Sequence, residues 1–190
     1  MNFNVFGLSS NIEKALADLS FISPTPVPER VIPQILNETR DIIALAQTGT
    51  GKTAAFGLPL LERVNPLSKE TQILILCPTR ELCMQIVRDM KGFSKYLPHF
   101  GITAVYGGAS ASTQIRELKQ GARIIVATPG RLLDLINRGA AKLSSLRYLV
   151  LDEADEMLNM GFRDELDEIL SNIPSERQTL LFSEIGRAHV

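Results

Sequence analysis

The chain has 190 residues, of which 45% are hydrophobic and 22% are charged. This length suits one α/β domain with a sizeable core and is too short for two domains of ordinary size. The 20 basic and 21 acidic residues give a net charge of −1, so composition alone gives no indication of nucleic-acid binding. Any nucleic-acid contact must be local, and motifs must supply the argument for it.

Membrane and secretory segments are not expected. No apolar run approaches the length that crosses a bilayer, and residues 1–20 lack the basic start and apolar segment of a secretory signal. The chain is therefore predicted to be cytosolic. Cys77 and Cys83 lie in apolar surroundings, which favours burial over a disulfide or a reactive thiol. His99 and His189 form no metal-ligand pattern, so no metal cluster is expected.

The N-terminal part predicts two helices joined by a proline-rich segment. Within residues 3–20, apolar residues recur at helical spacing after good N-cap residues, which is typical of a short amphipathic helix. Residues 21–28 contain too many prolines to be helical. Pro28 can begin the second helix, because proline is tolerated in a first turn. Pro33 is then expected to kink or interrupt that helix.

Short apolar runs rich in β-branched residues predict six strands. They are residues 42–45, 73–76, 102–105, 124–127, 148–151 and 179–182. Helical patterns with one apolar face lie between them, as at residues 82–90 and 162–170, and the charged outer face of the second is expected to be solvated. This alternation predicts an α/β fold, with a mainly parallel sheet covered by helices on both faces.

Polar clusters follow five of these runs, where ligands of parallel sheets bind. The clusters are residues 46–53, 78–82, 107–108, 128–131 and 152–155. Because the carboxyl ends of parallel strands lie at the same edge of the sheet, all five clusters are expected to share one rim.

The cluster AQTGTGKT, from Ala46 to Thr53, predicts a phosphate-binding loop between a strand and a helix. Gly49 and Gly51 allow the backbone to curl, so that N–H groups and the helix dipole converge on phosphate oxygens. Lys52 would reach the terminal phosphates, and the Thr53 hydroxyl would ligate Mg²⁺. Ala46 replaces the first glycine of the pattern. The alternative, an ordinary glycine-rich turn, would not need a lysine and a threonine at these offsets.

Asp152 and Glu153 are the candidate metal and water partners of that loop. Asp152 follows buried apolar residues, so its carboxylate would be held at the rim, where it could orient Mg²⁺ through water. Glu153 is the candidate to polarise an attacking water. The alternative is that these acids cap the helix starting near Ala154. The phosphate loop upstream favours the metal interpretation.

Together, the five clusters resemble the DEAD-box family of ATP-dependent RNA helicases, in family order and at family-like intervals. The resemblance implies that residues 1–183 form the N-terminal one of two RecA-like lobes, with an adenine-recognition segment in residues 1–38. ATP and Mg²⁺ would lie between the lobes, and RNA would lie across both, held by its backbone independently of sequence. The second RecA-like lobe, which this chain lacks, would be a partner of the first.

The resemblance also implies roles for individual residues. Those implied in nucleotide binding are Phe21, Thr25, Thr48, Gly49, Thr50, Gly51, Lys52 and Thr53. Those implied in catalysis are Lys52, Asp152 and Glu153, with Thr53 and Asp152 as metal ligands. Those implied in RNA binding are Thr79, Arg80, Gly107, Gly108, Thr128, Gly130 and Arg131. Those implied in coupling between the lobes are Asp155 and Ser183.

Exposed N–H groups at turns and helix starts suit the RNA role, because they bind phosphates without reading bases, while contacts to the 2′-OH distinguish RNA from DNA. For Arg80, the alternative is an ion pair with Glu81 or another neighbouring acid. For residues 128–130, the alternative is an N-cap followed by a turn.

The adenine-recognition segment departs from the family pattern at one position. Phe21 matches the aromatic that stacks on the base, and Phe6 matches the isolated upstream aromatic that packs near it. Pro28 stands where the family has a glutamine, whose amide complements the adenine edge. We therefore predict weakened ATP selectivity, by roughly 1–3 kcal/mol if the edge is left unpaired in a dry pocket. An engineered change or a sequence error at Pro28 is the alternative.

The end of the chain is the second departure. Residues 184–190 have no apolar periodicity and no family likeness, and their codons can spell a sequencing adaptor, so they are predicted to be non-native. A fragment without the second lobe lacks the arginines that the lobe brings to the γ-phosphate, so little hydrolysis or unwinding is expected. The alternatives are a nucleotide-dependent RNA-binding clamp without efficient ATPase activity, and a P-loop NTPase acting on a protein or small molecule.

Overall fold

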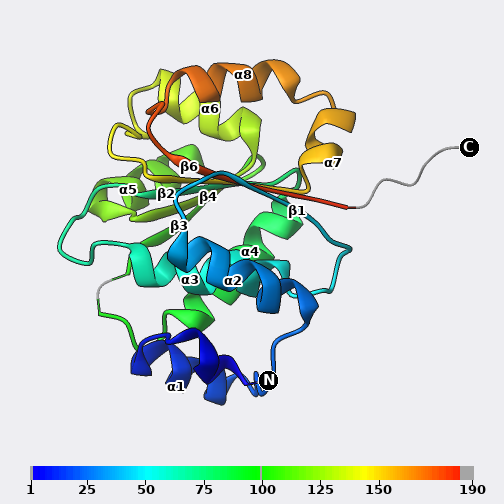
Figure 1. Ribbon diagram of the computed structural model, residues 1–190. Coiled ribbons are helices and arrows are strands. Elements are labelled where there is room, and N and C mark those ends of the chain that lie inside the picture. Colours follow the sequence, from blue (N-terminus) through cyan, green and yellow to red (C-terminus); the bar gives the residue numbers. More distant parts are fainter. Residues whose placement is uncertain (1, 99, 185–190) are drawn as a thin grey trace, which may run out of the picture.

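A central parallel sheet lies between two layers of helices in the computed structural model, which describes residues 2–98 and 100–184 (Figure 1). Within these residues, six strands pair in the order β1-β6-β5-β2-β4-β3, and every pairing is parallel. The strands are β1 (Ile42–Leu45), β2 (Ile73–Leu76), β3 (Ile102–Val105), β4 (Ile124–Ala127), β5 (Tyr148–Asp152) and β6 (Gln178–Ser183). The predicted α/β fold with a mainly parallel sheet is confirmed.

Helices cover the sheet on both sides. Below it in Figure 1 lie a short 3-10 turn, η1 (Phe3–Phe6), and the helices α1 (Ser10–Asp18), α2 (Pro26–Asn37), α3 (Lys52–Arg63) and α4 (Arg80–Phe93). The remaining helices are α5 (Ala111–Gly121), α6 (Pro129–Asn137), α7 (Ala154–Asn159) and α8 (Arg163–Ser171). Of these, α6, α7 and α8 lie above the sheet. Each face of the sheet therefore has its own apolar core.

Strand β2 shows why the predicted strands read as continuous apolar runs. Successive side chains of a strand point to opposite faces of the sheet. Ile73 and Ile75 are buried in the core shared with α3 and α4, whereas Leu74 and Leu76 are buried in the core shared with α6 and α8. A central strand of a sheet that is covered on both faces is therefore apolar along most of its length.

The carboxyl ends of all six strands lie at one edge of the sheet, because every strand runs in the same direction. The loops and helix starts that follow β1 to β5 begin at that edge. The prediction that the five polar clusters share one rim is therefore confirmed.

Two expectations about helices need correction. Helix α2 begins at Pro26, so the expectation that residues 26–28 are not helical is wrong. The helix runs through Pro33 to Asn37, so the expected interruption at Pro33 is wrong as well. Burial of apolar residues of α2, such as Ile32 and Ile35, stabilises the helix against the loss of one backbone hydrogen bond. The predicted N-terminal helix is confirmed as α1, which follows the N-cap residue Ser9 and ends at Asp18. The helix expected at residues 162–170 begins at Arg163 and ends at Ser171.

The two cysteines are buried and unpaired, as predicted. In the part of the chain that the structure describes, no helix is long and apolar enough to cross a membrane.

Candidate functional site

The loop between β1 and α3 curls as predicted, and Gly51 is essential to its shape. Gly49 and Gly51 have φ angles of +78° and +85°, in the left-handed region that L side chains rarely adopt. A Cβ atom on Gly51 would lie 2.8 Å from the Oγ1 of Thr25 and 3.1 Å from the Cγ of Pro28. The loop therefore fits against the N-terminal segment only with a glycine at position 51.

A hydrogen bond joins the N-terminal segment to this loop. The Thr25 hydroxyl donates to the carbonyl oxygen of Thr50 at 2.6 Å, and the Thr50 hydroxyl donates to the carbonyl oxygen of Gln47, also at 2.6 Å. Pro28 is buried beside them, with its ring against Gly51. The structure thus brings together Thr25, Thr50 and Gly51, three residues implied in nucleotide binding.

Lys52 is held next to the carboxylates that follow β5. Its side chain is 7% exposed, and its Nζ lies 3.7 Å from the Oδ1 of Asp152 and 3.9 Å from the Oε1 of Glu153. Within residues 2–98 and 100–184, neither the Nζ of Lys52 nor the Oδ1 of Asp152 has a hydrogen-bond partner. Buried polar atoms are normally paired, so this arrangement is suited to a bound group that supplies the missing partners.

Burial raises the pKa of Asp152, and the nearby Lys52 ammonium opposes that rise. Burial also raises the pKa of Glu153, again against the effect of Lys52, and the charges of Asp152, Glu184 and Asp155 raise it further. Several carboxylates therefore gather around one buried ammonium. The excess of negative charge would be offset by a cation at this point.

The residues at this edge fit Mg²⁺ together with phosphate oxygens. Mg²⁺ is commonly bound through one or two protein oxygens, with waters and substrate phosphates as its other ligands. The Oδ1 of Asp152 is buried without a hydrogen-bond partner among the described residues, and Thr53 lies in the first turn of α3, directly after Lys52. Among the described residues, no group of three or more His, Cys, Asp or Glu residues could hold a metal without such help.

Glu153 adopts a backbone conformation that is unusual for its residue type. Its φ is +54°, and it stands at the N-cap of α7, where its side chain makes no capping hydrogen bond. The alternative in which these acids serve as helix caps is therefore not supported for Glu153. A left-handed conformation at a non-glycine residue costs on the order of 1–3 kcal/mol and is characteristic of functional sites.

A hollow of about 340 Å³ unites most of the residues implied in nucleotide binding. Its lining includes Phe21, Thr48, Gly49, Gly51, Lys52, Thr53, Asp152 and Glu153. Gln85, Asp89 and Phe93 of α4 also line it, and the sequence did not single them out. These three residues recur at intervals of about one helical turn, and this spacing is the sequence signal that could have placed them on one face of the helix.

The aromatic rings of Phe21 and Phe93 line this hollow. Phe21 is 40% exposed, and its ring centroid lies 6.1 Å from that of Phe3 and 5.8 Å from that of Phe93. Phe6, the aromatic expected near the adenine-recognition segment, has its ring centroid 6.0 Å from that of Phe3. Phe3 therefore mediates between Phe6 and the candidate stacking ring, a role that the sequence did not reveal.

The clusters after β2 and β3 come together through Arg80. Thr79 is the N-cap of α4, and its hydroxyl accepts a hydrogen bond from the N–H of Leu82. The Arg80 guanidinium lies over the Tyr106 ring, 5.0 Å from its centroid, and close to Gly108. The proposed alternative for Arg80 is not observed, since its side chain forms no ion pair in the portion that the structure describes.

Arg131 connects the clusters after β3 and β4. Its Nη1 donates hydrogen bonds to the carbonyl oxygen of Ala109 at 3.0 Å and to the Oε1 of Gln114 at 3.1 Å. Thr128 is the N-cap of α6 but makes no side-chain cap bond, and Gly130 is exposed. Arg131 therefore has a structural role within the protein, whereas Thr128 and Gly130 keep polar groups available at the surface.

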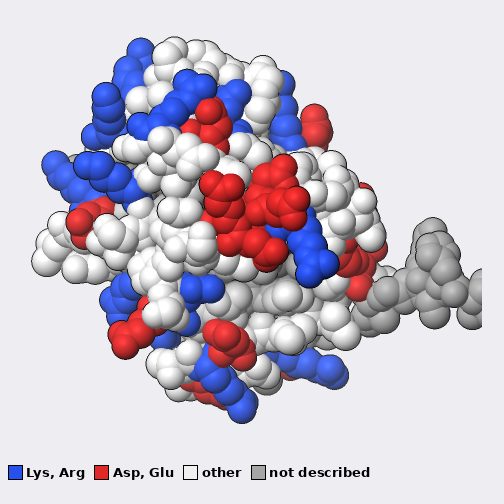
Figure 2. Space-filling model, turned by 90° about the horizontal axis from the view of Figure 1, so that it is seen from above, with Lys and Arg blue, Asp and Glu red and all other residues white. Residues whose placement is uncertain are grey.

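The face that is seen from above Figure 1 carries no broad basic surface among the described residues (Figure 2). Figure 2 shows separate groups of acidic and basic side chains on the face that is seen from above Figure 1. Helix α8 on this side carries exposed Asp164, Asp167 and Glu168.

The segment after β6 reaches back to the phosphate loop. The Glu184 carboxylate accepts a hydrogen bond from the backbone N–H of Thr48 at 3.0 Å. Ser183, at the end of β6, donates its hydroxyl to the carbonyl oxygen of Glu184 at 3.3 Å, and the Oδ1 of Asp155 is buried without a hydrogen-bond partner among the described residues. The rest of the segment predicted to be non-native, 185–190, lies outside the described residues.

Comparison with known proteins identifies the family. The family model described as DEAD/DEAH box helicase matches residues 25–183. The chain belongs to this family. The DEAD-box chain also resembles a crystal structure of a DEAD box protein from the hyperthermophile Methanococcus jannaschii, with a TM-score of 0.92 and 44% sequence identity. That match covers 98% of this chain and 50% of the other, and the fold is a RecA-like P-loop domain.

Curated relatives of this DEAD-box chain are longer. ATP-dependent RNA helicase DeaD of Haemophilus influenzae is 48% identical over 96% of this chain and 30% of its own length. ATP-dependent RNA helicase CshA of Listeria monocytogenes is 51% identical over 95% of this chain and 34% of its own length. The DEAD-box chain thus spans about a third of the length of the relatives that it matches.

Proposed function

We propose that residues 1–183 form the N-terminal RecA-like lobe of an ATP-dependent RNA helicase, and that this lobe binds ATP with Mg²⁺ and the RNA backbone along the carboxyl edge of its sheet. The observation that carries the proposal is the buried Lys52 ammonium, 3.7 Å from Asp152 and 3.9 Å from Glu153, beside a phosphate loop. The buried atoms without hydrogen-bond partners among the described residues, in a hollow lined by loop residues, suit an anionic ligand and its cation.

The nucleotide would lie with its phosphates against the loop and its base towards Phe21. Backbone N–H groups of residues 48–53 would hold the phosphate oxygens, and Lys52 would approach the terminal ones. Thr53 and Asp152 would hold Mg²⁺, directly or through water. The metal would neutralise charge that develops on the transferred phosphoryl group.

Glu153 would orient the attacking water. Burial raises the pKa of Glu153, which makes its carboxylate a stronger base once it is ionised. The residue lies between β5 and α7, where its backbone is left-handed. Phosphoryl transfer depends mainly on positioning and charge stabilisation. This lobe alone would position the nucleotide and leave γ-phosphate stabilisation incomplete, so we expect the isolated fragment to hydrolyse ATP very slowly.

RNA would lie across the loops after β2, β3 and β4. Thr79, Arg80, Gly107, Gly108, Thr128, Gly130 and Arg131 lie in these loops or in the helix starts beside them. Arg80 and Gly108 are already close to each other, which supports one continuous surface. Contacts of this kind act on phosphates and sugars and would give affinity without sequence preference.

Equilibrium titration with a fluorescent ATP analogue in the presence of MgCl₂ tests the nucleotide proposal. Lys52→Ala should weaken binding by at least about tenfold, because a charge-assisted contact to phosphate is lost. The matched control is Lys91→Ala on α4, whose side chain is exposed. Equal affinity of the wild type and Lys52→Ala would refute the proposal, provided that circular dichroism shows both to be folded.

The RNA proposal needs its own measurement. Crosslinking of a uniform single-stranded RNA should map to peptides that contain residues 79–80, 107–108 and 128–131. A crosslink map confined to other surfaces would refute the RNA proposal and leave the nucleotide proposal intact.

A further inference from the structure

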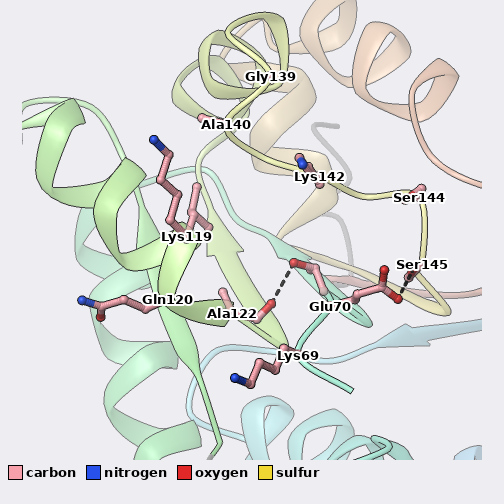
Figure 3. A pocket seen from close by; sticks show the side chains of 13 residues that line it. Lys69, Glu70, Lys119, Gln120, Ala122, Gly139, Ala140, Lys142, Ser144 and Ser145 are labelled. Atoms are coloured by element: carbon pink, nitrogen blue, oxygen red, sulfur yellow. Dashed lines mark hydrogen bonds between the residues drawn. The ribbon is translucent and has the colours of Figure 1, made fainter. Parts of the chain in front are cut away.

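A larger cavity, of about 530 Å³, opens at the opposite edge of the sheet. Figure 3 shows that its walls come from segments far apart in the sequence. They are residues 69–71 before β2, residues 118–122 before β4, and residues 139–145 before β5. Each segment precedes a strand of the parallel sheet, so the cavity lies at the amino edge, away from the candidate nucleotide site.

The cavity has a surplus of positive charge. Lys69, Lys119 and Lys142 line it, one from each wall segment. None of these lysines forms an ion pair within the residues that the structure describes. Glu70 supplies a carboxylate, which accepts a hydrogen bond from the Ser145 hydroxyl at 2.7 Å. The ammonium groups are therefore available to an external anion, whereas the carboxylate is engaged.

The walls are fixed by contacts within the protein. The Thr71 hydroxyl, which is buried, donates a hydrogen bond to the carbonyl oxygen of Ala122 at 2.7 Å (Figure 3). This bond and the Ser145 bond to Glu70 tie the three wall segments together. A preformed cavity loses little entropy when it binds a ligand.

Apolar atoms form part of the surface. Leu118 and Ala140 are half-buried, and they line the cavity beside Lys119 and Lys142. Small-molecule sites typically have volumes of about 300–1,000 Å³, with apolar walls and a few polar groups that fix the ligand's orientation. The cavity meets this description.

We propose that this cavity binds a phosphorylated organic molecule of metabolite size. Lys119 and Lys142 hold its phosphate groups, and Leu118 and Ala140 contact its organic body. Lysine suits this role, because its ammonium group is a compact point charge with several donors on a flexible stem. The proposal does not depend on nucleotide binding at the carboxyl edge.

Amide chemical shifts of the ¹⁵N-labelled full chain test the proposal, with fructose 1,6-bisphosphate as the probe and fructose as the uncharged control. The bisphosphate should give saturable shifts at Gly121, Ala140 and Ser144. Lys119→Gln/Lys142→Gln should weaken this binding by at least about tenfold. Lys91→Gln, an exposed lysine of α4, is the matched control and should leave the affinity unchanged.

The same spectra show whether the double variant is folded, since an unfolded chain loses its shift dispersion. Shifts confined to the phosphate loop at Gly49 and Gly51 would overturn the proposal, as would equal shifts with fructose. Binding that survives in the double variant would also overturn it. A single-stranded RNA that moves the same amides at lower concentration than the bisphosphate would assign the surface to RNA instead.

Discussion

The carboxylate of Glu184 accepts a hydrogen bond from the backbone N–H of Thr48, at 3.0 Å. An anionic group thus already occupies one of the loop donors that the proposed phosphates would use. The Glu184 charge also contributes to the raised pKa of Glu153, which places it close to the candidate catalytic carboxylates. In this chain, the segment after β6 is therefore positioned to compete with a bound nucleotide.

We predict that Glu184→Gln binds ADP more tightly than the wild type does, by a few-fold, as is typical of a partly exposed charge interaction. The substitution keeps the side-chain size and removes the charge that repels phosphate. Titration with a fluorescent ADP analogue measures the change. Glu176→Gln, which replaces an exposed acid before β6, is the control. Unchanged or weaker ADP binding by Glu184→Gln would contradict the competition.

A second prediction concerns pH. Because the pKa of Asp152 is raised in the folded protein, its contribution to stability is full below the unfolded pKa of about 4 and is lost as pH rises through the folded pKa. The free energy of unfolding of the wild type relative to Asp152→Asn should therefore fall as pH rises through this window.

Urea unfolding at a series of pH values measures this difference. Asp164→Asn, on the exposed side of α8, is the control and should follow the wild type. Parallel pH profiles of the wild type and Asp152→Asn would show that Asp152 has an ordinary pKa.

A third prediction separates contact from backbone strain at the phosphate loop. Gly51→Ala should destabilise the fold by about 1–3 kcal/mol from its left-handed backbone alone, and further from the Cβ contact with Thr25 at 2.8 Å. Gly139 has φ +66° and open space around its Cβ position, so Gly139→Ala measures the strain alone. Thermal unfolding of both variants gives the comparison. Equal losses would mean that the N-terminal segment moves away without cost.

A fourth prediction follows from Pro28, which is buried against Gly51. Pro28→Gln should increase the preference for ATP over GTP, by an amount equivalent to roughly 1–3 kcal/mol, because an amide can pair with the adenine edge. Competition titrations of the two nucleotides on both variants measure the ratio. If that ratio is the same before and after the substitution, the base is recognised elsewhere.

The strands and the phosphate loop could be predicted from the sequence because their signals are local. The run at residues 73–76 is apolar at every position, as burial on both faces requires, and the loop motif fixes residue types at fixed offsets. Asp152 could be placed at the rim for the same reason. The proximity of its carboxylate to Lys52 followed only from the order of the strands.

What the sequence missed depends on packing between distant segments. Phe3 contacts Phe21 because η1 folds onto the segment after α1, and Phe93 reaches the same ring from α4. The continuity of α2 through Pro33 rests on burial in the core. The contacts of Arg131 with Ala109 and Gln114 join two loops whose distance in space no local pattern encodes.

The place of β1 in the sheet has a consequence for how the protein acquires its site during synthesis. In the part of the chain that the structure describes, β1 pairs with β6 alone, so Ile42–Leu45 aligns with residues 180–183. A domain generally folds as a unit during synthesis, and contacts between segments that are distant in the sequence form late. The strand that leads into the loop at Ala46 therefore gains its sheet partner only when the last strand has emerged. A nascent chain stalled before that strand would carry the whole phosphate-loop motif without the sheet partner that holds it in place.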